Sequence, residues 1–221
     1  MDEKPMVPLV FQRRTEAEMR SAAQSFQALM SSRRTVRHFS AEPVPADIIE
    51  ACLQTAGSAP SGANLQPWHF VAVQDPAMKA RIREHSEIEE KAFYESRAPE
   101  EWKKVLKKFG TDAIKPYLEK APWLIAIFAV NSFENEQGQK QQTYYPKESV
   151  GIATGFLISA LHQAGLATLT HTPSPMNFLN DLLDRPKTEK PFLLLIAGYP
   201  EEGAQVPELA KKPFSEIATI L

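Results

Sequence analysis

The eight consecutive residues Trp123–Val130 constrain the fold more than any other stretch, because all of them are apolar. A strand with one face in water alternates polar and apolar residues, whereas a strand covered on both faces is apolar throughout. This run therefore predicts a strand buried on both faces.

The remaining periodicities mix strands and helices. Strands are predicted at 68–73, 166–172 and 192–197. Helices are predicted at about 15–32, 46–55, 150–164 and 175–183, and also from Asp75-Pro76 onward and through much of 86–120. Thr15 and Glu18 are spaced as a capping box, and Asp75 with Pro76 forms a second helix start. Residues 132–143, rich in Gln and Glu, are predicted to be a surface loop, and 150–164 a buried helix. This mixture indicates an α/β or α+β fold.

Length and composition favour one globular domain over residues 1–221. The chain has a formal net charge of -2, so nothing in its overall charge favours nucleic acid or an anionic membrane. No apolar run approaches the roughly 18 residues of a membrane span, and the N-terminus is unlike a signal peptide. The single cysteine, Cys52, excludes an intrachain disulfide and a CxxC metal site. We expect a cytoplasmic protein without a metal.

Two long arms flank the predicted domain, at 1–14 and 202–221. Arms of this kind suggest exchange between the subunits of a homodimer, and the apolar segment 150–164 favours that interpretation. The alternative is that both ends are disordered.

Two segments point to a flat, phosphorylated cofactor. Ser31–Arg37 places three arginines and three hydroxyl side chains within seven residues. Arginine forks suit a phosphate, although arginines at the end of a helix also stabilise its dipole. Gly57–Asn64 is a loop of small residues, whose backbone N–H groups can approach a bound ring. No P-loop and no Gly-x-Gly-x-x-Gly fingerprint is present, so a Rossmann dinucleotide site is not expected.

These two segments, followed by Gln66-Pro67-Trp68, resemble the nitroreductase-like flavoproteins, and the resemblance continues through Ala197–Pro200 to Lys211-Lys212-Pro213. It implies an α+β fold with a central mixed sheet flanked by helices, arms exchanged in a homodimer, and FMN at the subunit interface. The residues that it assigns to FMN are Arg33, Arg34, Thr35, Arg37, Pro60, Ser61, Gly62, Thr170, His171, Thr172 and Lys211. Thr172, expected near the flavin N5 atom, is the candidate catalytic residue. As residues alone, Thr170 and Thr172 are equally ordinary strand residues.

A third group of residues bears on the substrate. Glu90 and Tyr94 are four apart, so they share a helix face, and Lys115 follows after Gly110. Most charges in 86–120 are expected to belong to a solvated helix face. Yet Glu90–Tyr94 and Ile114–Leu118 resemble the active-site lid of iodotyrosine deiodinases. That resemblance implies that Glu90, Tyr94 and Lys115 bind the zwitterion of a halotyrosine, and that the Ala63 N–H supports its phenolate.

The function expected from this resemblance is FMN-dependent reductive dehalogenation of halotyrosines, with 86–120 as the active-site lid. A broad-specificity nitroreductase or another FMN oxidoreductase is the alternative, and a non-catalytic flavin-binding protein is a third possibility. No membrane anchor is expected, unlike in the animal members. His171 stands where the subfamily has threonine, and its role is open. The electron donor, a reductase or NAD(P)H, and the proton donor to the ring carbon are not identified by the sequence.

Overall fold

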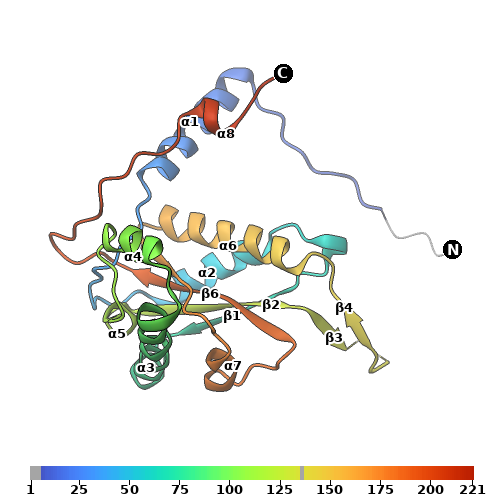
Figure 1. The fold of residues 1–221 in the computed structure, drawn as a ribbon. Helices are drawn as coiled ribbons and strands as arrows, with labels where there is room; N and C mark the ends of the chain where they lie inside the picture. The colour runs from blue at the N-terminus through green and yellow to red at the C-terminus, as the bar shows by residue number, and fades with distance from the viewer. Residues whose placement is uncertain (1–5, 135–136) are drawn as a thin grey trace. The chain divides into compact units, whose positions relative to one another are not determined.

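The computed structural model describes residues 6–134 and 137–221 (Figure 1). The chain forms two compact units, one that ends at Arg33 and one that spans Arg34–Leu221. Each unit is described by itself below.

The first unit holds one helix, α1 (Glu16–Ser32), preceded by an extended segment. The capping box predicted at its start is confirmed: the Thr15 hydroxyl accepts from the Glu18 N–H at 3.3 Å, and the Thr15 N–H donates to Glu18 Oε2 at 2.8 Å. Helix α1 buries none of its residues. The apolar side chains of the first unit are therefore largely exposed, including Met6, Val7, Leu9, Val10, Phe11, Met19 and Phe26.

The second unit is built on a sheet of four strands in the order β1-β2-β6-β5. The strands are β1 (Trp68–Val73), β2 (Trp123–Val130), β5 (Ala167–His171) and β6 (Glu189–Gly198). All three neighbouring pairs are antiparallel. The prediction of a mixed sheet is therefore wrong for these four strands. Among the described residues, parallel pairing is limited to an isolated bridge between Thr35 and Thr168.

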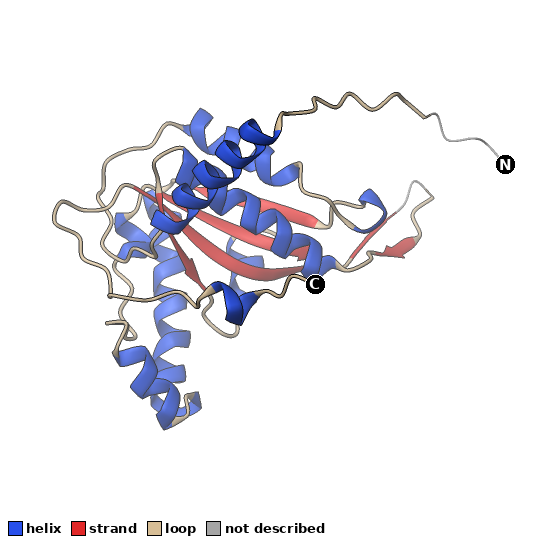
Figure 2. Ribbon diagram, turned by 90° about the horizontal axis from the view of Figure 1, so that it is seen from above, coloured by secondary structure: helices blue, strands red, loops and turns tan. Residues whose placement is uncertain are grey.

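Strand β2 is covered on both faces, as the all-apolar run predicts. Leu124, Ala126 and Phe128 belong to a core shared with α3 (Pro76–Ala92), α5 (Tyr117–Lys120) and α7 (Phe178–Leu182). The alternating residues Ile125 and Ile127 belong to a second core, shared with α2 (Ala46–Gly57) and α6 (Pro146–Gln163). The sheet therefore lies between two helical layers (Figures 1 and 2). Each fully buried Ile or Leu contributes roughly 1.5–3 kcal/mol by leaving water.

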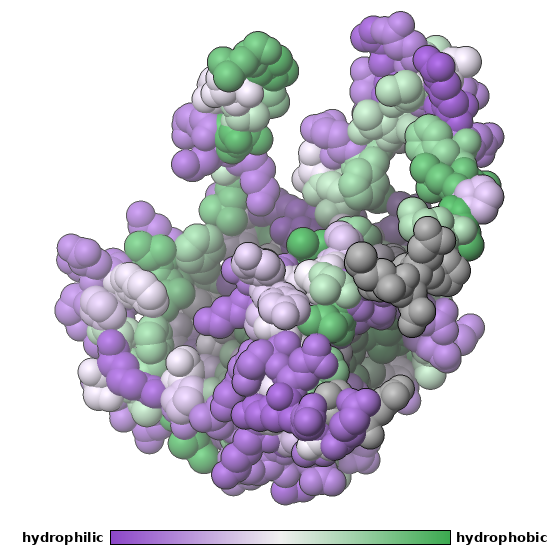
Figure 3. All heavy atoms as spheres, turned by 90° about the vertical axis from the view of Figure 1, so that its right-hand side faces the viewer, coloured by the Kyte–Doolittle hydropathy of each residue, from purple (hydrophilic) through white to green (hydrophobic). Residues whose placement is uncertain are grey.

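Two sequence predictions need correction. Residues 132–143 do not form a plain loop, because β3 (Ser132–Glu134) and β4 (Lys140–Gln142) pair as a hairpin. Five of its six strand residues are polar, Phe133 being the exception, so the sequence shows no apolar alternation there. The region that the hairpin occupies, low on the face shown in Figure 3, is largely hydrophilic. The predicted buried helix at 150–164 begins earlier, at Pro146, and leaves Ile152 and Phe156 44% and 40% exposed.

The segment predicted as a lid is a chain of short helices. Helix α3 continues to Ala92 and passes into a π-helical turn, η2 (Phe93–Arg97), before α4 (Glu100–Lys107). The helical path is interrupted at Pro99, which precedes α4, and at Gly110, which adopts a φ of 61°. The C-terminal arm contains α8 (Phe214–Ile217). Among the described residues, no helix has the length and apolar character needed to cross a membrane.

Candidate active site

A stripe along helix α3 and the turn η2 that continues it supplies most of the polar groups of the candidate site. Arg83, Glu87, Glu90 and Tyr94 are spaced by four, three and four residues, which places them on one helical face. Asp75 fixes the start of the helix by accepting from the Met78 N–H at 2.7 Å, as its sequence predicts. The face therefore begins from a defined register and points towards the segment 110–117.

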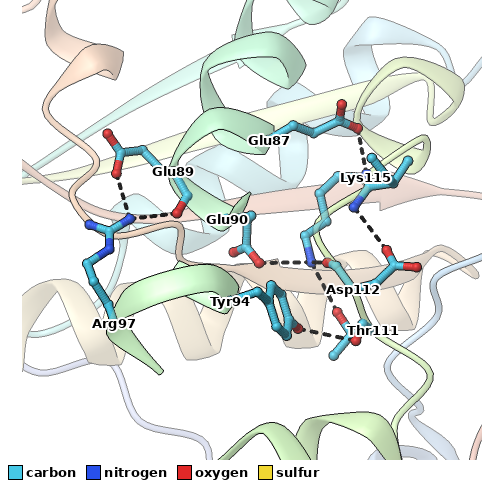
Figure 4. A network of polar contacts seen from close by, with 9 residues as sticks. Glu87, Glu89, Glu90, Tyr94, Arg97, Thr111, Asp112 and Lys115 are labelled. Carbon is cyan, nitrogen blue, oxygen red and sulfur yellow. Dashed lines mark hydrogen bonds and ion pairs between the residues drawn. The ribbon is translucent and has the colours of Figure 1, made fainter. Parts of the chain in front are cut away.

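Lys115 is the centre of the site (Figure 4). Its side chain is only 3% exposed, and its Nζ atom lies 3.0 Å from Oε2 of Glu90, whose side chain is 14% exposed. The ammonium also donates to the Thr111 hydroxyl at 3.1 Å and to the Asp112 carbonyl. All three ammonium protons therefore have acceptors within the protein, as a buried charge requires.

Tyr94 completes the group of three residues expected from the sequence. Its hydroxyl donates to the Thr111 carbonyl at 3.2 Å, and the Lys115 Nζ atom lies 5.7 Å from the centre of its ring. Burial raises the pKa of the Tyr94 hydroxyl, so the group stays a neutral donor. Phe93 packs edge-on against Tyr94 and also contacts Trp102 of α4. The structure thus brings Glu90, Tyr94 and Lys115 together.

The arginine segment runs along the outer edge of β5. The Val36 N–H donates to the Thr168 carbonyl at 3.2 Å, and the Ser40 N–H donates to the Tyr199 carbonyl at 2.9 Å. Arg37 is half-buried. Burial raises the pKa of Tyr117, and the positive charge of Arg37 offsets part of this rise. Arg37 therefore lies at the same corner of the sheet as the lid residues.

The other predicted phosphate ligands are arranged less compactly. Arg34 donates to the Pro207 carbonyl, which ties the C-terminal segment to the edge of the sheet, and Lys211 lies exposed four residues further on. Within the described part of the second unit, Arg34, Arg37 and Lys211 form no ion pair with a carboxylate. Their charges are available for an anion. Arg33 is the C-cap of α1 and ends the first unit.

Strand alternation separates the three residues 170–172. Thr170 and Thr172 are exposed, whereas His171 is buried, 6% exposed, with its ring edge-on to Tyr117 at 5.9 Å. Burial and, second, the charge of Lys115 lower the pKa of His171 to about 3, so its imidazole is neutral at pH 7. Its Nε2 atom makes no hydrogen bond to the described residues. His171 therefore faces the lid side of the core, opposite the two threonines.

The loop after α2 has a strained backbone. Ala63, Asn64 and Gln66 all have φ near +50°, a region that L-residues rarely occupy, and Ala63 lies in the short helix η1 (Gly62–Asn64). The Ser61 hydroxyl braces this loop by accepting from the Gln66 N–H at 2.9 Å. A Cβ atom on Gly62 would lie 3.1 Å from the Tyr144 carbonyl oxygen, so only glycine fits there without displacement. Strain of this kind is concentrated at binding sites.

The loop and the arginines lie at opposite corners of the same sheet. The loop leads into Trp68 on edge strand β1, whereas the arginine segment pairs with Thr168 on edge strand β5. Three strand spacings separate the two edges, about 14 Å, and the register places the two points about 20 Å apart along the strands. Pro60, Ser61, Gly62 and Ala63 are therefore not brought to Arg37, Glu90, Tyr94 and Lys115 within one chain.

The donor groups fit FMN in kind. Unpaired arginines suit its phosphate, the small-residue loop suits close approach to its ring, and Thr170 and Thr172 offer exposed hydroxyls on and just after β5.

Three polar residues of the site were missed by the sequence analysis: Glu87, Thr111 and Asp112. Glu87 had a detectable signal, because it lies three residues before Glu90 on the same helical face. Thr111 and Asp112 act largely through backbone carbonyls, which no sequence pattern marks.

Comparison with known proteins identifies the family. Residues 30–199 match the Nitroreductase family.

The chain belongs to the nitroreductase family.

Within the nitroreductase family, the chain is most informatively compared with iodotyrosine deiodinases. The iodotyrosine deiodinase of Haliscomenobacter hydrossis is 48% identical over 221 residues, which cover 100% of both chains. Iodotyrosine deiodinase 1 of Rattus norvegicus is 47% identical over 91% of this chain and 71% of its own. A crystal structure of oxidized iodotyrosine deiodinase bound to FMN and 3-iodo-L-tyrosine superimposes with a TM-score of 0.76 and 30% identity, covering 88% of this chain and 100% of the other.

Proposed function

We propose that this protein is an FMN-dependent iodotyrosine deiodinase, which removes halide reductively from halotyrosines. The observation that carries the proposal is the convergence of Glu90, Tyr94 and Lys115 in one buried cluster, in a chain so similar to iodotyrosine deiodinases over its whole length. A nitroaromatic substrate has no ammonium and carboxylate to match such a cluster.

The cluster is complementary to an amino-acid zwitterion. The Glu90 carboxylate binds the α-ammonium, and the Lys115 ammonium binds the α-carboxylate. Tyr94 contributes a hydroxyl and an apolar ring. The segment 86–120 acts as a lid, whose closure excludes water from the site and strengthens these charge interactions.

The cofactor would be held by residues that the resemblance to nitroreductase-like flavoproteins assigns to it. Within the second unit, Arg34, Thr35, Arg37 and Lys211 would bind the phosphate and ribityl chain. Thr170 and Thr172 would line the flavin, with Thr172 as the catalytic hydroxyl. FMN, when bound and reduced, supplies two electrons. His171 faces away from Thr170 and Thr172, so its role is indirect.

The opposite corners of the sheet support a homodimeric site. A two-fold axis brings the loop of one subunit to the arginines of the other, and repeats the arrangement at a second site. Pro60, Ser61 and Gly62 then border the ring from the partner, and the Ala63 N–H supports the phenolate of the substrate. The exposed Ile152 and Phe156 on α6, together with exposed apolar side chains of the C-terminal segment such as Phe214 and Ile217, offer surface for the interface and for exchanged arms.

The overall reaction balances with an external reductant. The ring carbon–halogen bond is replaced by a carbon–hydrogen bond, and halide leaves, at the expense of two electrons and one proton. The electrons come from a reductase or from NAD(P)H.

A direct test uses the FMN-loaded protein reduced with dithionite. We expect iodide release from 3-iodo-L-tyrosine, with tyrosine as the product, and quenching of flavin fluorescence when 3-iodo-L-tyrosine binds the oxidized protein. A protein that reduces nitroaromatics but neither binds nor deiodinates 3-iodo-L-tyrosine would be a nitroreductase in function.

A further inference from the structure

We infer that Glu87 is a positioning residue for the substrate site, which fixes the backbone of Lys115 so that its ammonium is presented to the substrate carboxylate. The inference rests on the proposed function for the identity of the ligand. The contacts that support it belong to the protein alone.

Glu87 binds Lys115 through the main chain rather than the side chain. The Lys115 N–H donates to Glu87 Oε1 at 2.6 Å, a short bond that spans 28 positions of the sequence. Arg83 Nε donates to the same oxygen at 2.7 Å. Bonds from a neutral N–H to an ionised carboxylate are roughly twice as strong as bonds between neutral groups. This contact therefore ties the backbone of the turn at 110–117 to α3 (Figure 4).

Two carboxylates of α3 bind different parts of Lys115. Glu87 holds its backbone, and Glu90, three residues further along the same face, holds its ammonium at 3.0 Å. Of the two, only Glu90 is in a position to exchange its partner for a substrate ammonium. Glu87 keeps Lys115 in place while that exchange occurs.

The rest of the turn follows Lys115. The Ile114 N–H donates to the Asp112 side chain at 2.9 Å, and the Leu118 N–H donates to the Lys115 carbonyl at 3.0 Å, which begins the short helix α5. Arg83, which also binds Glu87, forms an ion pair with Glu119 of α5 at 3.4 Å. The Arg83–Glu87 pair is therefore connected to α5 as well. Thr111 lies on this turn and contacts both Tyr94 and Lys115. Loss of the Glu87 contact would therefore loosen all three zwitterion ligands relative to one another.

The test compares Glu87→Ala, Glu87→Gln and Glu89→Ala in the FMN-loaded protein. Glu87→Gln keeps an oxygen acceptor for the Lys115 N–H. Glu89→Ala is the matched control, because Glu89 is a carboxylate of the same helix that pairs with Arg97 at 2.9 Å and not with Lys115. One measurement is hydrogen exchange of the peptide 111–118 without substrate, and the other is the Kd for 3-iodo-L-tyrosine from flavin quenching.

We expect Glu87→Ala to accelerate exchange at Lys115 and to raise the Kd about tenfold, because a buried N–H loses its acceptor. Glu87→Gln should restore both to within about threefold of the wild type, and Glu89→Ala should leave both unchanged. Unaltered exchange, or an unaltered Kd, in Glu87→Ala would overturn the inference. If 3-iodo-L-tyrosine fails to bind even the wild type, the deiodinase function falls instead, and the exchange experiment still decides whether Glu87 fixes Lys115.

Discussion

The Nζ atom of Lys115 lies 3.0 Å from the Oε2 atom of Glu90, and both side chains are largely buried. The two groups that we assign to the substrate carboxylate and ammonium thus neutralise each other. A zwitterion carries the same two charges, so it can enter the pair without leaving either charge unpaired. The pair thereby favours free amino acids over neutral phenols and nitroaromatics.

Removal of the Lys115 charge should separate halotyrosine binding from other flavin chemistry. In Lys115→Met we expect the Kd for 3-iodo-L-tyrosine to rise about 100-fold, because a buried charge partner is lost. The rate of nitroaromatic reduction by the FMN-loaded protein should change by less than about threefold, because a nitroaromatic has no α-carboxylate for Lys115 to bind.

Lys107→Met provides the matched control for this comparison. Lys107 ends α4 within the same predicted lid and is exposed, so its loss should leave the Kd unchanged. Equal loss of both activities in Lys115→Met would count against its assignment as a substrate ligand.

The ion pair also predicts a non-additive effect on stability. Glu90→Leu leaves the Lys115 ammonium buried beside only neutral acceptors, and should lower the free energy of unfolding by about 3 kcal/mol. The double variant Glu90→Leu/Lys115→Met removes both charges and should recover to within about 1 kcal/mol of the wild type. Urea unfolding of the FMN-loaded protein measures both values. If the two single effects simply add, the charges are not coupled in the folded state.

His171 makes stability depend on pH in the acidic range. Its folded pKa of about 3 lies below the ordinary value of 6.5, so between these limits the unfolded chain binds more protons than the folded one. The neutral imidazole therefore makes its full contribution to the free energy of unfolding above about pH 7. This contribution is lost as the pH falls from about 6.5 towards 3. Below pH 6 we expect the wild type to lose stability more steeply than His171→Thr.

Denaturant titrations at pH 4, 5, 6 and 7 measure the two slopes. Tyr117 packs edge-on against His171, and burial raises the pKa of its hydroxyl, so Tyr117 stays neutral over this range. His38→Gln removes an exposed imidazole and serves as the control. Identical slopes in the wild type and His171→Thr would show that His171 is accessible to protons in the folded state.

Much of the fold follows from side-chain patterns that are physically specific. The all-apolar β2 predicted two covering layers, and Thr15 with Glu18 predicted the start of α1, because in each case the residues themselves supply the stabilising contacts. The β3–β4 hairpin was missed because its strands are mostly polar and are paired through the backbone. The wholly antiparallel order of the sheet likewise depends on pairings between distant segments, which local periodicity does not encode.

The candidate site was likewise predicted only in part. Glu90 and Tyr94 could be placed together because four residues separate them on one helix, and resemblance supplied Lys115. The spacing of Glu87 from Glu90 marks its helical face, but not its partner, which is the Lys115 main chain. Thr111 and Asp112 offer main-chain carbonyls, and such contacts leave no residue signature. The sequence also could not show that the Gly57–Asn64 loop and Arg37 lie at opposite corners, because that separation arises from strand order.

This separation leads to a complementation prediction. If each FMN site takes Arg37 from one subunit and Gly62 from the other, then Arg37→Ala and Gly62→Val each damage both sites of a homodimer. Gly62→Val does so by forcing the loop away from the Tyr144 carbonyl. A mixed dimer, however, carries both lesions in one site and leaves the other site intact. Equal co-expression should therefore restore about a quarter of the wild-type FMN content, since half of the dimers are mixed and each has one native site of two.

Flavin absorbance per chain measures this recovery, with circular dichroism to confirm that each variant alone is folded. Tandem affinity tags, one on each variant, isolate the mixed dimers, in which the expected FMN content rises to about half. A site built within one chain gives a different result, because each damaged subunit then stays damaged whatever its partner. Mixed dimers without FMN would consequently overturn the shared site, and with it the reason for placing Ala63 beside the substrate phenolate.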